Sequence, residues 1–146
     1  MRKMDNAQAM MRKLQRGRYT LVVDSGNAVR DYEGHGLTAL HHLLATAPRL
    51  LDGAAVGDKV IGKGAAALMV LGHVRCVIGL VVSRPALELL QRNGISVTCI
   101  DLVPHIMGAG KTGMCPLEEL CADIDTADRM KPIIDRFVEQ QQEQPQ

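Results

Sequence analysis

Hydrophobic positions repeat along the chain with two different periods, and each period predicts a different kind of element. Spacings of three and four residues predict helices, whereas β-branched alternation or a short continuous apolar run predicts a strand. The expected helices cover residues 1–18, about 37–47, 62–71, 85–92 and 127–140, with a short one that starts at Pro116. The expected strands cover 19–24, 28–33, a segment that ends at 61, and then 74–82 and 95–103.

The order of these elements predicts an α/β domain with a mixed sheet. Residues 19–33 form a β-hairpin pattern around the turn residues Ser25-Gly26-Asn27. The apolar runs 74–82 and 95–103 bracket a helix, which is typical of a parallel βαβ unit buried on both faces. We therefore expect helices on both faces of the sheet. An N-terminal helix over 1–18 precedes one domain over 19–139, and the polar tail over 140–146 is expected to be disordered.

The aromatic content, net charge and apolar runs of the chain argue against nucleic acid and membranes as binding partners. A chain of 146 residues is long enough for one buried core, but it holds one Phe, two Tyr and no Trp, so it lacks aromatic stacking platforms for single-stranded nucleic acid. The net charge of +1 provides no field that attracts polyanions or membranes. No apolar run has the length of a signal peptide or membrane span, and the four cysteines lack disulfide-framework spacing. We expect a cytoplasmic protein with reduced thiols that binds neither nucleic acid nor membranes.

The segment 60–69 is the strongest candidate for a functional site. It runs from an apolar strand end through Gly62-Lys63-Gly64 into a helix that begins with three alanines. Small residues let a backbone approach closely, and helix N–H groups at the carboxyl end of a strand can bind an anion. Lys63 would then bind that anion, or act as a general acid or base if burial shifted its pKa. A solvated lysine is the structural alternative.

Four further residues lie near predicted strand ends or helix starts. Ser83 could bind a ligand or simply cap the following helix. Cys115 precedes Pro116 at a helix start, where a thiolate is stabilised, although a buried structural thiol is the more common case. His105 could serve as a base or ligand, or as a hydrogen-bonded structural residue. Glu118 could bind a ligand or only complement the helix dipole.

Two apparent motifs do not meet their patterns. The loop 108–112 resembles a phosphate loop, but position 105 is His where that pattern requires Gly, so we expect a flexible loop that could act as a lid. A zinc site from His105, Cys115 and Cys121 would lack a fourth ligand and the close cysteine pairing of zinc knuckles.

The element order is also similar to the cytidine deaminase-like core, in which His-x-Glu and Pro-Cys-x-x-Cys at two helix starts supply the zinc site. Alignment on those motifs places Gly62, Gly64, Ala86 and Leu89 at the ligand and general acid/base positions. None of these residues can bind zinc or transfer a proton. We therefore expect no zinc, no other cofactor and no zinc-dependent deamination.

Four strings in order resemble the bacterial domain of unknown function 1893 family: residues 62–69, 83–90, 103–106 and 113–118. The resemblance covers about residues 19–138. It implies a deaminase-like fold without the zinc signature, a three-layer arrangement, and no assigned activity.

Three function hypotheses follow. The favoured one is a metal-free module that binds a small polar or anionic, perhaps nucleotide-like, ligand through Gly62, Lys63, Gly64, Ser83, His105, Cys115 and Glu118. The second is an enzyme that uses Lys63, His105 or Cys115 for acid/base or nucleophilic chemistry. The third is a structural or regulatory homo-oligomer, and some self-association is expected in any case.

Overall fold

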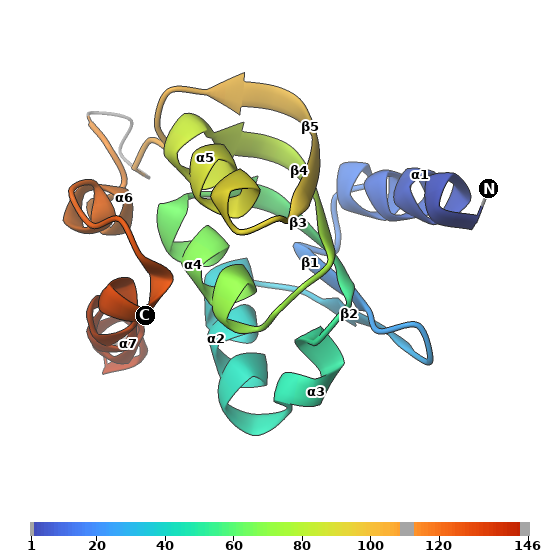
Figure 1. The fold of residues 1–146 in the computed structure, drawn as a ribbon, viewed down its shortest axis with the longest axis horizontal. Coiled ribbons are helices and arrows are strands. Elements are labelled where there is room, and N and C mark those ends of the chain that lie inside the picture. Colours follow the sequence, from blue (N-terminus) through green and yellow to red (C-terminus); the bar gives the residue numbers. More distant parts are fainter. Residues whose placement is uncertain (1, 109–112, 144–146) are drawn as a thin grey trace.

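A single five-stranded sheet organises the chain, with strand order β2-β1-β3-β4-β5 (Figure 1). The computed structural model describes residues 2–108 and 113–143. The strands are β1 (Leu21–Asp24), β2 (Val29–Tyr32), β3 (Ala55–Ile61), β4 (Cys76–Ser83) and β5 (Ser96–Val103). The first hairpin and the β1–β3 pair are antiparallel, whereas β3, β4 and β5 are parallel. The predicted hairpin, βαβ unit and mixed sheet are confirmed, but β5 is not buried on both faces as expected, because it is an edge strand and one of its faces is exposed.

The helices divide between the two faces of the sheet. α1 (Arg2–Gln15) packs on β1, β3 and β4, and α2, α4, α5 and α7 lie on the opposite side (Figure 1). Their bounds are α2 (Gly36–Thr46), α3 (Pro48–Leu51), α4 (Lys63–Leu71), α5 (Arg84–Arg92), α6 (Pro116–Cys121) and α7 (Ala127–Glu143). α4 is the central helix, because it contacts α2, α5, α6 and α7 as well as β3. Its first seven residues are all buried, which explains why it is built from small side chains.

The core has two parts, one on each face of the sheet. The larger part joins the sheet to α2, α4, α5, α6 and α7, and the smaller part places Met10 and Leu14 of α1 against Val22 and Ile78. Gly57 makes the smaller part possible. A Cβ atom there would come within 2.6 Å of the Met10 side chain, so only glycine lets α1 lie this close to β3.

One predicted boundary is confirmed and another is wrong. α2 ends at Thr46, before Pro48, as predicted, and Pro48 also occupies the first turn of α3, where its missing N–H has no cost. α7 extends to Glu143, so the helix includes the first four residues of the tail that was expected to be disordered. Gln and Glu are good helix formers, which lets the helix continue. Residues 144–146 and most of the loop 108–112 lie outside the described residues.

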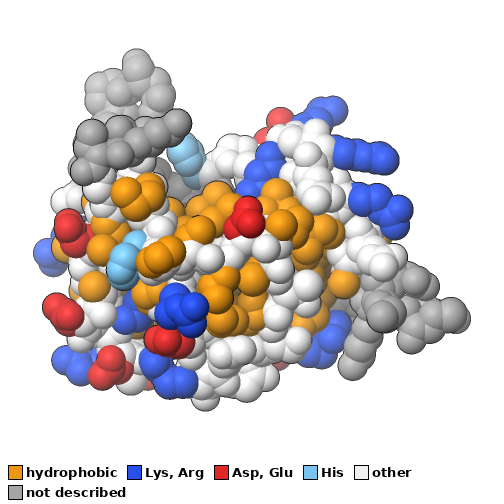
Figure 2. All heavy atoms as spheres, turned by 90° about the horizontal axis from the view of Figure 1, so that it is seen from above, with side chains coloured by type: hydrophobic (Ala, Val, Ile, Leu, Met, Phe, Trp, Pro, Cys, Tyr) orange, Lys and Arg blue, Asp and Glu red, His pale blue; other side chains and the backbone are white. Residues whose placement is uncertain are grey.

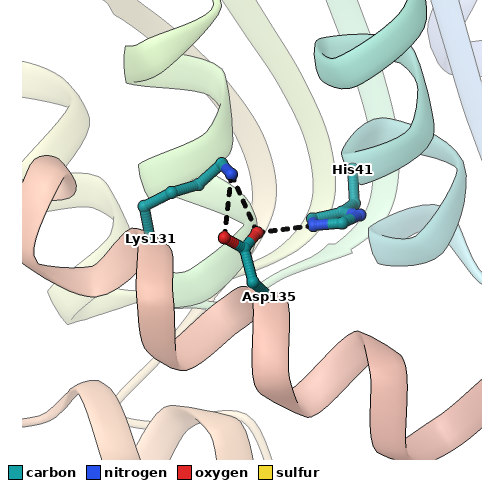
Figure 3. A network of polar contacts seen from close by, with 3 residues as sticks. All are labelled: His41, Lys131 and Asp135. Carbon is teal, nitrogen blue, oxygen red and sulfur yellow. Dashed lines mark hydrogen bonds and ion pairs between the residues drawn. The ribbon is translucent and has the colours of Figure 1, made fainter.

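A polar network joins α7 to α2 across the helical layer (Figure 3). His41 Nε2 lies 2.7 Å from Asp135 Oδ1, and Lys131 Nζ donates to the same carboxylate at 2.8 Å. Partial burial raises the pKa of Asp135, but the hydrogen bonds from Lys131 and His41 outweigh it and hold that pKa below its usual value. The three groups are partly exposed, so the network orients α7 more than it stabilises the fold.

Candidate functional site

A cleft of about 260 Å³ opens where three helix starts and the end of β3 meet. Its walls come from the start of α2, the end of β3, the first turn of α4, the 106–118 segment and the last turns of α7. Most of the lining is apolar. The lining residues are His35, Gly36, Leu37, Val60, Gly62, Lys63, Gly64, Ala65, Ile106, Cys115, Leu117, Glu118, Phe137 and Gln141.

Five of the seven residues predicted for the site line this cleft: Gly62, Lys63, Gly64, Cys115 and Glu118. Ser83 and His105 are not among the lining residues. Ser83 is fully buried and caps α5, since its Oγ accepts a hydrogen bond from Ala86 N at 3.2 Å. His105 is exposed beyond the end of β5. The structural alternative for Ser83 is therefore the one observed.

The carboxylate of Glu118 is the electrostatic centre of the cleft. Glu118 is 3% exposed, and its two oxygens accept hydrogen bonds from Lys63 N and Ile106 N, each at 2.7 Å. Lys63 N is the first N–H group of α4, so Glu118 supplies negative charge at that helix's N-terminus. The second bond fixes the segment that follows β5. The sequence predicted that a ligand would supply an anion at the start of this helix. In the structure, the carboxylate of Glu118 occupies that place.

The Lys63 side chain is directed away from any anion at the helix start. Its Nζ donates to the carbonyl of Ala122 at 3.0 Å, and Lys63 is buried. Ala122 is the C-cap residue of α6, where a cation interacts favourably with the helix dipole. α4 and α6 therefore cap each other. The Glu118 carboxylate accepts a hydrogen bond from the first N–H group of α4, and the Lys63 ammonium donates one to the C-cap carbonyl of α6.

The glycines on either side of Lys63 make room for α6. A Cβ atom at Gly64 would overlap the Leu117 side chain, and one at Gly62 would lie 3.2 Å from Glu118 Oε1. The sequence indicated a close approach at these positions, but the approaching atoms belong to α6. Beyond Lys63 N, the N–H groups of Gly64 and Ala65 have no hydrogen-bond partner among the described residues.

The four cysteines are free thiols in different surroundings. Burial raises the pKa of Cys121 to about 11, more than nearby Lys63 lowers it. Cys115 is half-buried and lines the cleft. Cys76 and Cys99 lie in the apolar runs 74–82 and 95–103, which the sequence indicated to be buried, but both residues are only half-buried. The reason for Cys99 is that β5 is an edge strand.

Asp58 is a buried carboxyl that sequence reasoning missed. It is 3% exposed in β3, and its Oδ2 atom has no hydrogen-bond partner. Burial raises its pKa to about 8, against the lowering effect of the Val60 and Lys59 N–H groups. Its Oδ1 atom would lie 2.8 Å from a Cβ atom at Gly36, the first residue of α2 and part of the cleft wall. The sequence feature that could have indicated this buried carboxyl is the position of Asp58 as the one acidic residue of the apolar strand β3.

Metal ligands do not gather in the part of the chain that the structure describes: no group of three or more His, Cys, Asp or Glu could hold an ion. In the same residues, none of the helices combines the length and hydrophobicity that crossing a membrane requires.

Comparison with known families agrees with the four motif strings. The family model described as a domain of unknown function (DUF1893) matches residues 9–138. The chain belongs to the DUF1893 family. This confirms the family that the motifs predicted and extends the match into α1.

A solved relative has the same fold. The crystal structure of a DUF1893 family protein from Thermotoga maritima is 25% identical in sequence and superposes with a TM-score of 0.78. The match covers 87% of this chain and 86% of that one. Among proteins with curated functions, none matches the chain.

The part of the cleft that sequence reasoning missed comes from α2 and α7. His35, Gly36, Phe137 and Gln141 lie far from the 62–64 motif in sequence and carry no pattern that links them to it. The distribution of apolar positions predicted both helices but not that their ends would meet over α4.

Replacement of Gly64 tests the close packing of α6 on α4. Gly64→Ala should lower the free energy of unfolding by about 1–3 kcal/mol, because the new methyl group overlaps buried Leu117 and this outweighs the better helix propensity of alanine. Chemical denaturation measures the loss. Gly113→Ala, which meets nothing within 4 Å, is the control. A Gly64→Ala protein as stable as the wild type would contradict the packing.

Asp58 should make stability depend on pH. With a pKa near 3.9 in the unfolded chain and about 8 in the folded one, the folded state binds the extra proton between these values, so this group's contribution falls as pH rises from 4 to 8. Asp58→Asn should remove that dependence and stabilise the protein at pH 7, by an upper limit on the order of 4 kcal/mol.

Denaturation curves at pH 5 and pH 8 measure this difference. Exposed Asp52→Asn serves as the control and should follow the wild type. If Asp58→Asn and the wild type lose stability in parallel over this range, the carboxyl at position 58 is ionised in the fold.

Proposed function

We propose that the chain is a metal-free binding module whose cleft takes a small, largely apolar molecule with one hydrogen-bond acceptor. The observation that carries the proposal is the convergence of five predicted site residues on one cleft beside the unpartnered N–H groups of Gly64 and Ala65. Two adjacent N–H groups at a helix start are suited to a carbonyl or carboxylate oxygen.

Charge and size narrow the class of ligand. Glu118 already neutralises the start of α4, and the Lys63 ammonium is engaged by Ala122, so the cleft offers no unbalanced cation to a phosphate group. The volume of 260 Å³ is just below the roughly 300–1,000 Å³ of most ligand pockets. These features favour a neutral carbonyl compound or a small monocarboxylate over a phosphate-bearing ligand, including the nucleotide-like one that the sequence suggested.

The scaffold itself is best interpreted as deaminase-like with a replaced site. The order of hairpin, strand, helix, strand, helix and strand supports this interpretation. On the corresponding alignment, Gly62 and Gly64 stand where a zinc ligand and a general acid/base would be, and both now accommodate α6. The ligand site would lie beside the position of the missing metal.

One observation favours an enzymatic alternative. The Cys115 thiol, which would be the nucleophile, lines the cleft from the N-cap position of α6. Lys63 and His105 lend no support, because the first is engaged by α6 and the second lies outside the cleft lining. His35 and Glu118 also line the cleft, but among the described residues no hydrogen bond joins Cys115 to either side chain, and both oxygens of Glu118 are engaged by backbone N–H groups. Binding is therefore the stronger proposal.

A screen with a site reporter tests the binding function. The probes are small aliphatic and aromatic amides and monocarboxylates, with nucleosides and nucleotides as the competing class. A ligand at 100 times its dissociation constant should add about 2.7 kcal/mol to stability, seen as a thermal shift, and should slow alkylation of Cys115.

The variant Val60→Trp places a large side chain at the cleft wall from a half-exposed position and should abolish both effects. Val29→Trp makes the same change at an equally exposed site outside the cleft and should retain them. Stabilisation by nucleotides alone would replace the proposed ligand class. Stabilisation that survives Val60→Trp, or no stabilisation by any probe, would contradict binding at this cleft.

A further inference from the structure

The two edges of the sheet differ in how well they are protected from pairing with another strand. β2 has four residues, of which Arg30 and Asp31 are charged, and Lys13 of α1 pairs with Asp31 at 3.0 Å. Short length and charge are common ways to prevent edge pairing. β5 has eight residues, and Asp101 is its one charged residue.

The outer side of β5 has no backbone partner in the described part of the chain. β5 pairs with β4 on one side, and no other strand or loop there bonds to residues 96–103. It is rich in β-branched and other apolar residues and contains neither Pro nor Lys. An unpaired strand of this length and composition is a template for another strand.

The sheet surface beside this edge is apolar and uncovered. Val97 and Cys99 pack against the helical core, so Thr98 and Ile100 point to the other face by strand alternation, and both are exposed. The main contacts of α1 are with β4, β3 and β1 and not with β5. Ile100 is 51% exposed and Leu102 40%. Figure 2 shows a broad hydrophobic area on this side of the molecule.

We propose that β5 pairs antiparallel with β5 of a second copy of this chain, which continues the sheet across a two-fold axis near Ile100. The charge pattern favours this occupant and this direction. With Ile100 opposite Ile100, Asp101 of each copy lies opposite Cys99 of the other, whereas parallel pairing in register would place the two Asp101 carboxylates side by side.

The difference in length and charge between β2 and β5 favours a closed dimer over an open assembly. Pairing of β5 with β2 of the next copy would extend without limit, but β2 is too short and too charged to complement β5. Pairing of β5 with itself closes after two chains and places the two exposed Ile100 side chains side by side on the same face of the sheet. The dimer does not depend on the cleft, whose walls come from other elements except for the segment after β5.

Mass measurement with edge variants tests the dimer. Light scattering coupled to size exclusion should give twice the chain mass of 15.9 kDa for the wild type. Ile100→Lys and Thr98→Lys should each reduce it to a single chain mass, because lysine at an exposed edge opposes pairing. Val29→Lys, the same change on β2 at a comparably exposed residue, should leave the dimer intact.

Circular dichroism and thermal melting establish whether each variant is folded. If Ile100→Lys does not fold, the mass of Thr98→Lys is used to test the dimer. Amide exchange gives an independent readout: β5 amides should be protected in the wild type and exchange faster in Ile100→Lys. A wild-type chain that remains monomeric at high concentration overturns the proposal. A dimer that persists in both β5 variants, or one that dissociates in Val29→Lys, overturns it as well.

Discussion

The buried carboxylate of Glu118 is the interaction on which the arrangement of the cleft depends. Removal of a carboxylate from water is costly, and this one is compensated by two short hydrogen bonds from Lys63 N and Ile106 N. One bond attaches α6 to the start of the central helix α4, and the other attaches the segment that follows β5. Three wall segments of the cleft therefore meet at a single side chain.

The reciprocal contact strengthens the same junction. Lys63 reaches from the start of α4 to the last carbonyl of α6, so each helix satisfies an end of the other. The two glycines beside Lys63 are required because α6 lies against them. A Gly-Lys-Gly string at a helix start indicates an anion site when it is considered alone. Here the string instead forms the surface against which α6 packs. What is left for a ligand is the adjacent apolar space and two N–H groups.

Local patterns were sufficient for the fold but only partly for the site. Helix and strand periods, the hairpin turn and the apolar runs are properties of neighbouring residues, so they predicted the elements, the hairpin and the parallel βαβ unit of a mixed sheet. The motif at residues 62–64 and the helix start at Cys115 marked the correct end of the sheet. The partner of Lys63 N is 55 residues away and that of its ammonium is 59 residues away, and no local signal connects such distant positions. Asp58 escaped notice because a single acid in a strand gives no indication of its depth.

The most direct test of this account is the free energy of unfolding of Glu118→Gln compared with that of Glu119→Gln, an exposed neighbour in the same turn of α6. An amide offers one acceptor oxygen and a donor that faces an N–H group, so one charge-assisted bond is lost and the other weakened. The account predicts a loss of about 2–3 kcal/mol for Glu118→Gln and almost none for Glu119→Gln. Equal stability of the two variants would show that α4 and α6 are held together without the charge of Glu118, by apolar packing and the Lys63–Ala122 bond, and would contradict the central role of Glu118.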